Sequence, residues 1–285
     1  MSTTTYTSPV DRLLSLGKPE SVLPEKWPNY LELGLGPENI PELIHMATDP
    51  ELRGPESEEK SEGEDPDFWA PLHAIRALGQ LQAGIAAEPL VNLLAGLKGD
   101  EWMLEELPSV FGMIGPVAIP ALTAYLADSS NDIYLRAYAS NGLLEIADRY
   151  PEHREESIAT ISRQLEAYEE NDYEFNAFII GDLVRLKAVE TLPLIERAFK
   201  ADRVDEFVVD LNYVLEEFGL KEREVVESPF LEMFKEISAS RAKQQETPSP
   251  SPEKPYIPPP SRTNSEKVIK FSGKKITKKK SKKKR

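Results

Sequence analysis

The 285-residue sequence contains no cysteine. This absence excludes disulfide bonds, a thiol nucleophile and every metal site built on thiolates. Histidine is nearly as scarce, because the chain has three histidines, His45, His73 and His153. No two of them stand four residues apart, so the paired-histidine zinc site of metalloproteases is also excluded.

Long apolar runs are missing as well. No run approaches the ~18 consecutive apolar residues that a membrane-spanning helix needs. The first ten residues are rich in serine and threonine, and they lack the basic region and apolar stretch of a secretory signal. We therefore expect a cytoplasmic protein without membrane contact.

Motifs for catalysis are lacking too. The sequence has no glycine-rich phosphate loop and no Gly-x-Ser-x-Gly elbow. Adjacent carboxylates such as Glu105-Glu106 point about 100° apart on a helix, so they do not share a proton. His73 lies beside the apolar positions Leu72 and Ile75, which predicts a hydrogen-bonded residue at the edge of the core. We expect a non-enzymatic protein with no cofactor and no metal, although a cleft formed by distant carboxylates stays open.

Charge is divided unevenly along the chain. The net charge is -15, from 49 acidic and 34 basic residues. Residues 267–285 hold 11 of the basic residues and no acidic one, which leaves 23 basic residues for the first 266. The sequence therefore joins a strongly acidic body to a strongly basic tail.

From Phe68 to about Leu220, apolar residues recur at intervals of three and four. This spacing is typical of amphipathic helices, and no stretch alternates as a strand does. Short breaks follow one another every 12 to 18 residues or so, at Ala83-Gly84, Gly99-Asp100, Gly115-Pro116, Ser129-Ser130, Tyr150-Pro151, Glu170-Asn171 and Lys187. Helices of that length with short connections predict antiparallel pairs.

An internal repeat of about 31 to 37 residues runs through the same region. Each copy has a glycine in the first helix, and most have a proline near the start of the second. The glycines are Gly79, Gly112, Gly142 and Gly181, and the prolines are Pro41, Pro89, Pro120 and Pro193. A first-turn proline costs no hydrogen bond. A glycine inside a helix costs about 1 kcal/mol, so we expect these glycines to permit close approach of a neighbouring helix.

Composition divides the chain further. We expect an N-terminal helix and connection over 1–28, a helical repeat domain over 29–222 with an acidic, mobile loop at 51–67, and a last helix over 223–240. Seven of the 13 residues from Pro248 to Pro260 are proline, which predicts an extended, disordered linker over 241–266 before the basic tail at 267–285.

The segment Ile114–Leu122 resembles the turn between the two helices of HEAT-like repeats, including those called phycobilisome-lyase-type. The layout of Leu192–Phe199, Val204–Glu206 and Val214–Leu220 is similar to that of an uncharacterised bacterial family of HEAT-like proteins that often end in a SEC-C motif. The resemblance covers about Trp27 to Leu220. It implies an all-α fold, a right-handed α-solenoid of antiparallel helix pairs with a disordered C-terminal tail.

The tail resembles the SEC-C motif at Ser272–Lys275. That motif binds zinc through three cysteines and a fourth cysteine or histidine, whereas the aligned positions here are Val268, Lys270, Lys279 and Lys280. None of these binds zinc at neutral pH. Both a SEC-C motif that has lost its metal and a chance match remain open.

Two groups of residues are candidates for binding. Five aromatic residues near helix starts or repeat turns could anchor a protein partner or pack within and between repeats: Trp69, Trp102, Tyr134, Tyr138 and Tyr173. Basic tail residues could contact RNA, ribosomes or other nucleic acid without sequence specificity: Lys274, Lys275, Lys278, Lys279, Lys280, Lys282, Lys283, Lys284 and Arg285. The tail could instead mask the acidic body or serve solubility.

These features favour an interaction scaffold whose helical surface binds a protein of unknown identity, with the tail adding weak contact to polyanions. Its many carboxylates would select basic partners and steer their approach. The alternative that the resemblance permits is an accessory or lyase-like subunit in bilin or phycobilisome chemistry.

Overall fold

The breaks in the apolar pattern separate helices in the structure. A computed structural model describes residues 5–53 and 65–222, and within these ranges it contains helices and no strand, as predicted. The α-helices are α1 (Ile40–Thr48), α2 (Pro50–Arg53), α3 (Ala70–Gln80), α4 (Ala87–Leu93), α5 (Glu101–Ile114), α6 (Ile119–Ala127), α7 (Ile133–Arg149), α8 (Arg154–Glu166), α9 (Tyr173–Arg185), α10 (Leu192–Lys200) and α11 (Leu211–Glu217). All seven predicted breaks fall between α-helices.

A short 3-10 turn directly precedes each helix of a set made of α1, α4, α6, α8 and α10. These turns are Pro37–Asn39 before α1, Gly84–Ala86 before α4, Pro116–Ala118 before α6, Pro151–His153 before α8 and Val189–Thr191 before α10. Pro41, Pro120 and Pro193 then occupy the first or second position of their helices. The amide that each proline lacks would have no partner inside the helix, so the predicted role of these prolines is confirmed.

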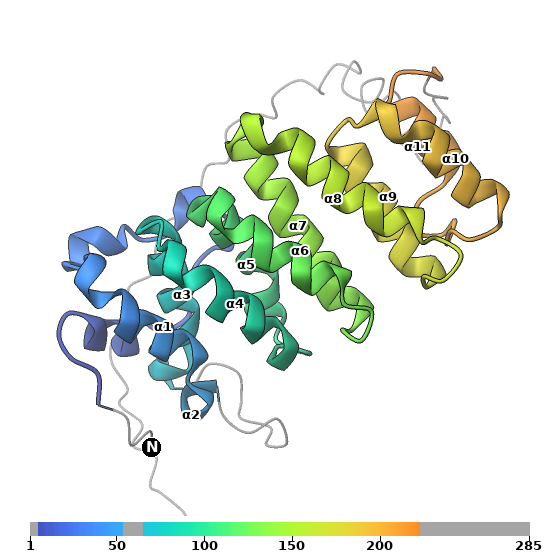
Figure 1. The fold of residues 1–285 in the computed structure, drawn as a ribbon. Coiled ribbons are helices and arrows are strands. Elements are labelled where there is room, and N and C mark those ends of the chain that lie inside the picture. Colours follow the sequence, from blue (N-terminus) through green and yellow to red (C-terminus); the bar gives the residue numbers. More distant parts are fainter. Residues whose placement is uncertain (1–4, 54–64, 223–285) are drawn as a thin grey trace, which may run out of the picture. The chain divides into compact units, whose positions relative to one another are not determined.

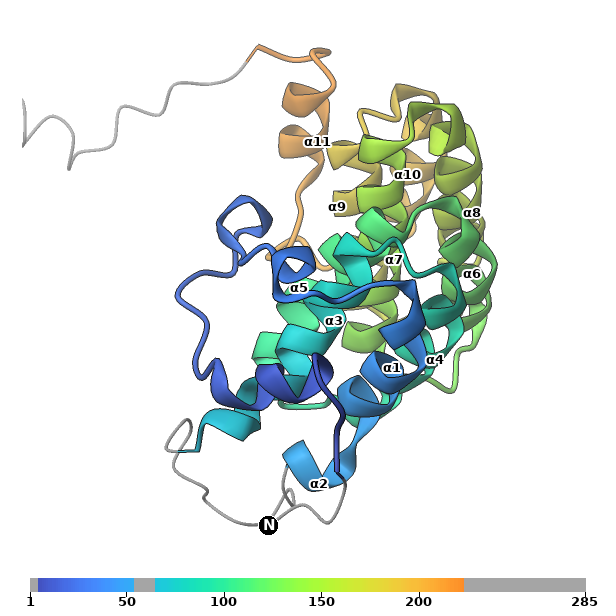
Figure 2. The same ribbon diagram turned by 90° about the vertical axis from the view of Figure 1, so that its left-hand side faces the viewer.

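The helices form two layers. In the first layer α3, α5, α7 and α9 pack side by side in chain order, and in the second α1, α4, α6, α8 and α10 do the same. The layers meet where α1 packs on α3, α6 on α7 and α8 on α9, as the two views together show (Figures 1 and 2). Their shared core contains the fully buried side chains of Leu78, Phe111, Leu122, Leu143 and Phe175.

The N-terminal segment covers part of the first layer. Its 3-10 turns at Val10–Ser15 and Tyr30–Leu33 pack on α3, on the side away from α4, α6 and α8 (Figure 2). This segment belongs to the same compact unit as the helices, which extends from Met1 to Glu224.

A buried ion pair holds the N-terminal segment in place. Arg76 on α3 donates to both carboxylate oxygens of Glu106 on α5, at 2.5 and 2.6 Å, and both side chains are almost completely buried. Burial raises the pKa of Glu106, and the hydrogen bonds and charge of Arg76 oppose that rise. Arg76 also donates to the Ser21 carbonyl at 2.8 Å and stacks on Trp27, so one guanidinium connects three segments.

His73 makes a second connection to the N-terminal segment. Its Nδ1 lies 2.6 Å from the Tyr30 hydroxyl, and its Nε2 lies 2.8 Å from the Gly17 carbonyl. Burial lowers the pKa of His73 to about 4, so the ring is neutral near pH 7. A neutral ring that donates from Nε2 accepts from Tyr30 at Nδ1, and the predicted hydrogen-bonded residue at the core edge is confirmed.

Both ends of the predicted acidic loop at 51–67 belong to helical elements in the structure. Residues 50–53 form α2, in which Leu52 is buried, and Pro66–Trp69 form a 3-10 turn. Residues 54–64 lie outside the described part of the chain, as do the predicted last helix at 223–240, the linker at 241–266 and the tail at 267–285.

Candidate functional site

The glycines of the repeat are places where neighbouring helices come close. A Cβ on Gly79 would lie 3.5 Å from the backbone of Val110, and one on Gly112 would lie 2.9 Å from the Cβ of Glu145. At Gly142 the nearest atoms belong to Leu122 and Phe111, at 3.2 Å. For these three glycines the predicted close approach is confirmed.

Gly181 on α9 differs from the other three glycines. A Cβ at this position would meet nothing within 4 Å, so the predicted close approach is wrong here. Beside Gly181 lie Val208 and Val209, which precede α11, and Tyr213 within α11, and these residues leave a space next to α9.

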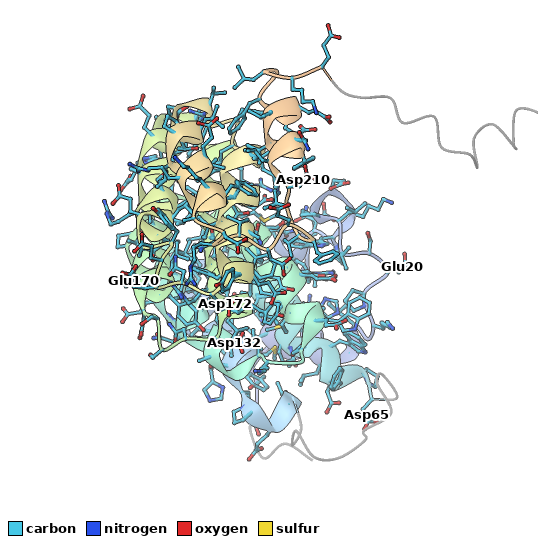
Figure 3. All side chains as sticks on the ribbon, turned by 90° about the vertical axis from the view of Figure 1, so that its right-hand side faces the viewer. Glu20, Asp65, Asp132, Glu170, Asp172 and Asp210 are labelled. Atoms are coloured by element: carbon cyan, nitrogen blue, oxygen red, sulfur yellow. The ribbon has the colours of Figure 1, made fainter. Side chains whose placement is uncertain are left out.

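That space is a pocket of about 270 Å³ between α7, α9 and the Val208–Tyr213 segment. It is lined by small, apolar, aromatic and polar side chains: Ala137, Asn141, Ala177, Phe178, Gly181, Asp182, Val208, Val209 and Tyr213. Figure 3 shows that Asp210, within this segment, lies on the same side of the helices as Glu20 of the N-terminal segment. The pocket therefore opens on the face of the first layer that is free of the second layer.

Asp182 is the buried charge of this pocket. The residue is 6% exposed, and its Oδ2 is shielded from solvent beside the Ser140 hydroxyl. Burial raises the pKa of Asp182 to about 7, against smaller opposing effects of Ser140 and Arg185. Arg185 itself donates to Asn141 Oδ1 at 3.0 Å, so it does not neutralise the carboxylate through a direct bond.

Carboxylates and aromatic rings continue from this pocket across α7 to α5. Tyr138 on α7 lies near Glu105 and Glu101, whose charges add to burial in raising its pKa. Tyr134 donates to Glu174 on α9 at 2.9 Å, and its ring centroid lies 5.7 Å from that of Phe178. We call this surface the acidic–aromatic face, and its members are Glu101, Glu105, Tyr134, Tyr138, Glu174 and Phe178.

Two further carboxylates lie at the edge of this face. Asp132 and Asp172, both labelled in Figure 3, cap the N-termini of α7 and α9, two helices that pack on each other. Each accepts a hydrogen bond from a backbone amide of its own helix. Asp132 also pairs with Lys98 at 2.8 Å, and its pKa is lowered chiefly by that hydrogen bond. The negative charge of Asp132 at this edge is therefore partly neutralised by Lys98.

The predicted aromatic anchors fall into three places. Tyr134 and Tyr138 belong to the acidic–aromatic face, and Tyr173 stands at the start of α9, where Arg203 donates to its hydroxyl at 2.9 Å and stacks on its ring. Trp69 and Trp102 contact each other far earlier in the chain, with ring centroids 5.3 Å apart.

The tryptophan pair already holds a cation of this chain. The ammonium of Lys18 lies 5.3 Å from the ring centroid of Trp69 and 4.8 Å from that of Trp102. Trp69 is only 2% exposed, whereas Trp102 is half-buried. In this arrangement the pair helps to attach the N-terminal segment to α3 and α5.

A second hollow lies on the other layer, between α4 and α6. It has a volume of about 770 Å³, with the exposed side chains of Ile85 and Val117 among its lining residues. The Tyr125 hydroxyl is buried beside it without a partner. The charged side chains that line it, Glu88 and Asp128, are exposed, so this groove lacks the buried charge that distinguishes the Asp182 pocket.

The residues that sequence reasoning missed are Asp182, Phe178 and Tyr213. Nothing in the local sequence separates Asp182 from the other acidic residues, because its burial depends on a segment some 26 residues later. The predicted polyanion contacts from Lys274 to Arg285 lie outside the described residues. Within the described ranges, no group of three or more acidic, histidine or cysteine side chains could hold a metal ion.

Length and composition give no single membrane-crossing helix among the described residues; α5 with the stretch Pro116–Ala127 passes that test only as a pair bent by 115°. No protein-family model, curated protein or solved structure matches this chain.

Proposed function

We propose that this protein is a non-enzymatic interaction scaffold: a right-handed, HEAT-like α-solenoid that binds a basic protein partner through its acidic–aromatic face. The observation that carries the proposal is the gathering of aromatic rings and carboxylates from three successive helices of one layer. Exposed aromatic side chains are a common source of binding energy in interfaces, and charge complementarity selects the partner.

The recurring construction of the helices supports the solenoid. A 3-10 turn followed by a helix with an early proline recurs along the second layer, and each helix of a layer packs on the helix before and the helix after it. In repeat proteins of this kind each unit contacts only its neighbours, and the row of first or second helices supplies an extended binding surface.

The chemistry of the face supports a basic partner. Tyr134 is about half exposed, and Glu101 and Glu105 on α5 are exposed. Carboxylates beside aromatic rings favour lysine and arginine side chains, which pair with the carboxylates and stack on the rings. The body of the chain is acidic throughout, so attraction at a distance would add to these contacts.

We assign the basic tail a separate role in weak, salt-sensitive contact with polyanions such as RNA. The support is its composition: residues 274–285 contain nine lysine or arginine residues and no acidic one. Such a segment binds phosphates by releasing counterions, without reading a base sequence.

Charge-reversing substitutions on the acidic–aromatic face test the proposal that this face binds a basic partner. The full-length protein is immobilised as the wild type, as the face variant Glu105→Lys/Glu174→Lys and as the matched control Glu155→Lys/Glu166→Lys on α8, whose two glutamates are exposed. Circular dichroism establishes equal helix content. We expect wild type and control to retain the same proteins from a lysate and the face variant to lose them. Equal retention by the face variant would contradict the proposal.

A further inference from the structure

The groove between α4 and α6 lies in the second layer, and none of its lining residues belongs to the acidic–aromatic face. We infer that this groove is a separate docking site, which receives an amphipathic helix of another protein. That helix would carry large apolar side chains on one side and lysine or arginine at the flanks of that side. The exposed apolar residues, the shape and the charge of the groove each support this occupant.

One position of the repeat is unusual where it borders the groove. The middle residue of each 3-10 turn that precedes a second-layer helix is exposed, and in three of these five turns it is a glutamate, Glu38, Glu152 or Glu190. In the two turns that border the groove it is Ile85 and Val117, which are 67% and 58% exposed. Large apolar side chains that gather in water mark a surface for protein binding. Of the five turns, the two beside the groove therefore have the residues of a contact surface.

The apolar surface continues along α6. Pro120 and Ala124 line the groove and are exposed, and Ala121 between them is half-buried. Counted from the start of the 3-10 turn, the residues of α8 that correspond to Pro120 and Ala121 are Glu155 and Glu156, both exposed. The outer side of α6 thus has small apolar side chains where that of α8 has charges. Small side chains at a contact allow the axes of two helices to come close together.

The walls of the groove favour a helix over an extended peptide. A helix satisfies its own backbone hydrogen bonds, whereas an extended peptide needs a strand edge, which walls made by α4 and α6 do not offer. The lining extends along α6 from Val117 to Asp128, a distance of roughly 16 Å at the rise of an α-helix. That length suits a helix of two to three turns. Because most of the lining residues are exposed, a small molecule would stay largely in water.

Both charged residues that line the groove are acidic. Glu88 lies one turn after Ile85, and Asp128 follows the last residue of α6, so one carboxylate stands toward each end. The Ser130 hydroxyl donates to Asp128 at 2.6 Å, and this hydrogen bond is the main cause of the lowered pKa of that carboxylate. Since no lysine or arginine belongs to the lining, basic residues at the flanks of the docked helix would meet attraction and acidic ones repulsion.

Three labelled peptides test the inference with the full-length protein. The probe is a capped 14-residue peptide of alanine, leucine and lysine whose leucines recur at intervals of three and four. The second peptide has the same composition with its leucines spread around the helix, and the third has glutamate in place of lysine. By fluorescence anisotropy we expect the probe to bind about 10-fold or more tightly than either, because the site requires both the apolar side and the charge.

A pair of matched variants tests the two exposed apolar residues. Ile85→Gln/Val117→Gln removes their apolar side chains at exposed positions, and we expect it to weaken the probe by about 10-fold or more. Glu152→Gln/Glu190→Gln introduces the same residues at the same position of two other turns and should bind the probe as wild type does. Circular dichroism establishes that both variants keep their helix content.

A single thiol locates the bound peptide, because the chain has no cysteine of its own. Ala124→Cys places the thiol in the groove, and Ala159→Cys places it at the corresponding position of α8; both alanines are exposed. Saturating probe should slow alkylation of the first thiol by about 10-fold or more and leave the second unchanged, since a covered thiol reacts slowly.

Three results would overturn the inference: equal binding of the three peptides, full binding by Ile85→Gln/Val117→Gln, or equal alkylation of the thiol from Ala124→Cys with and without probe. A dimer in sedimentation that Ile85→Gln/Val117→Gln disrupts would instead assign the groove to a second copy of the chain. The face variant Glu105→Lys/Glu174→Lys should bind the probe as wild type does. If it alone loses the probe, the peptide binds at the acidic–aromatic face, so the scaffold stands and the groove site falls.

Discussion

At the scale of single residues, Asp182 is a carboxylate whose burial should lower the stability of the fold when it is ionised. Folding buries its carboxylate, and the Ser140 hydroxyl and the charge of Arg185 offset only part of the cost of that burial. Such a group lowers stability when it is ionised, and positions that cost stability are often those that serve a ligand. This residue therefore gives a test by stability alone, without any ligand.

The first prediction concerns Asp182→Asn and pH. Burial raises the pKa of Asp182 from 3.8 to about 7 in the folded protein. Between these values the folded state keeps a proton that the unfolded state has lost, so this residue's contribution to stability decreases as pH rises toward 7. Asparagine does not titrate. The free energy of unfolding of the variant, minus that of wild type, should increase by about 2–3 kcal/mol from pH 5 to pH 8.

Urea unfolding followed by circular dichroism at the two pH values measures this difference. Glu170→Gln, at an exposed position in the turn before α9, serves as the control and should show no such trend. A constant difference between Asp182→Asn and wild type would mean that the carboxylate is not buried in solution.

At the scale of elements, the repeated glycines differ in how closely a neighbouring helix approaches them. The second prediction compares two of them. Gly112→Ala places a Cβ 2.9 Å from that of Glu145, so we expect a loss of about 1–3 kcal/mol. Gly181→Ala meets open space and gains helix propensity, so we expect a gain of about 0.5–1 kcal/mol. Urea unfolding of both variants measures these changes in the free energy of unfolding. Equal changes in the two variants would contradict the difference in packing.

The third prediction concerns the attachment of the N-terminal segment to α3 and α5. Removing one partner of a buried ion pair leaves the other charge uncompensated, so Glu106→Ala should cost about 3–5 kcal/mol. The double variant Arg76→Met/Glu106→Met should cost much less, because it removes both charges.

Because Arg76 also holds the Ser21 carbonyl, Glu106→Ala should speed trypsin cleavage after Lys26. The neighbouring and exposed Glu105→Ala is the matched control. Unchanged cleavage in Glu106→Ala would show that the segment is held by other interactions.

Much of the helical construction could be predicted from sequence because it is local. Apolar spacing, glycine and proline located the helix ends from Ala83-Gly84 to Lys187. The predicted pattern failed at Gly181 because the neighbour of α9 depends on the path of the chain around Val208. The ion pair between Arg76 and Glu106, which are 30 residues apart, could not be predicted either, because in the sequence each is an ordinary charged residue of a helix.

Only part of the candidate site could be predicted. Tyr134 and Tyr138 were found because aromatic residues near repeat turns are natural candidates for a surface. Asp182 was not found because burial, rather than residue type, makes it unusual. Trp69 looked the same as Tyr134 in sequence, yet it is almost completely buried, since its position relative to the N-terminal segment decides its exposure.

At the scale of the whole molecule, the opposite charges of body and tail suggest two partners of opposite charge. The fourth prediction concerns the tail. Replacing the seven basic residues from Lys278 to Arg285 by glutamine should weaken binding to a 20-nucleotide single-stranded RNA. It should also reduce the slope of log affinity against log salt by up to about 5, at about 0.7 for each phosphate that the tail no longer neutralises.

Fluorescence anisotropy at several salt concentrations measures that slope. Glutamine at Lys26 and Lys200, two exposed lysines of the body, is the control. Unchanged affinity and slope in the tail variant would rule out polyanion binding by this segment.

The central claim is that partners bind to the acidic–aromatic face. Its most direct test is photo-crosslinking from a benzoylphenylalanine placed at Phe178 on that face, compared with one placed at Phe199 on α10 of the second layer. Both phenylalanines are half-buried, so the two probes are matched. We predict a crosslinked protein partner from position 178 and none from position 199. Crosslinks from 199 alone, or none from 178, would contradict the claim.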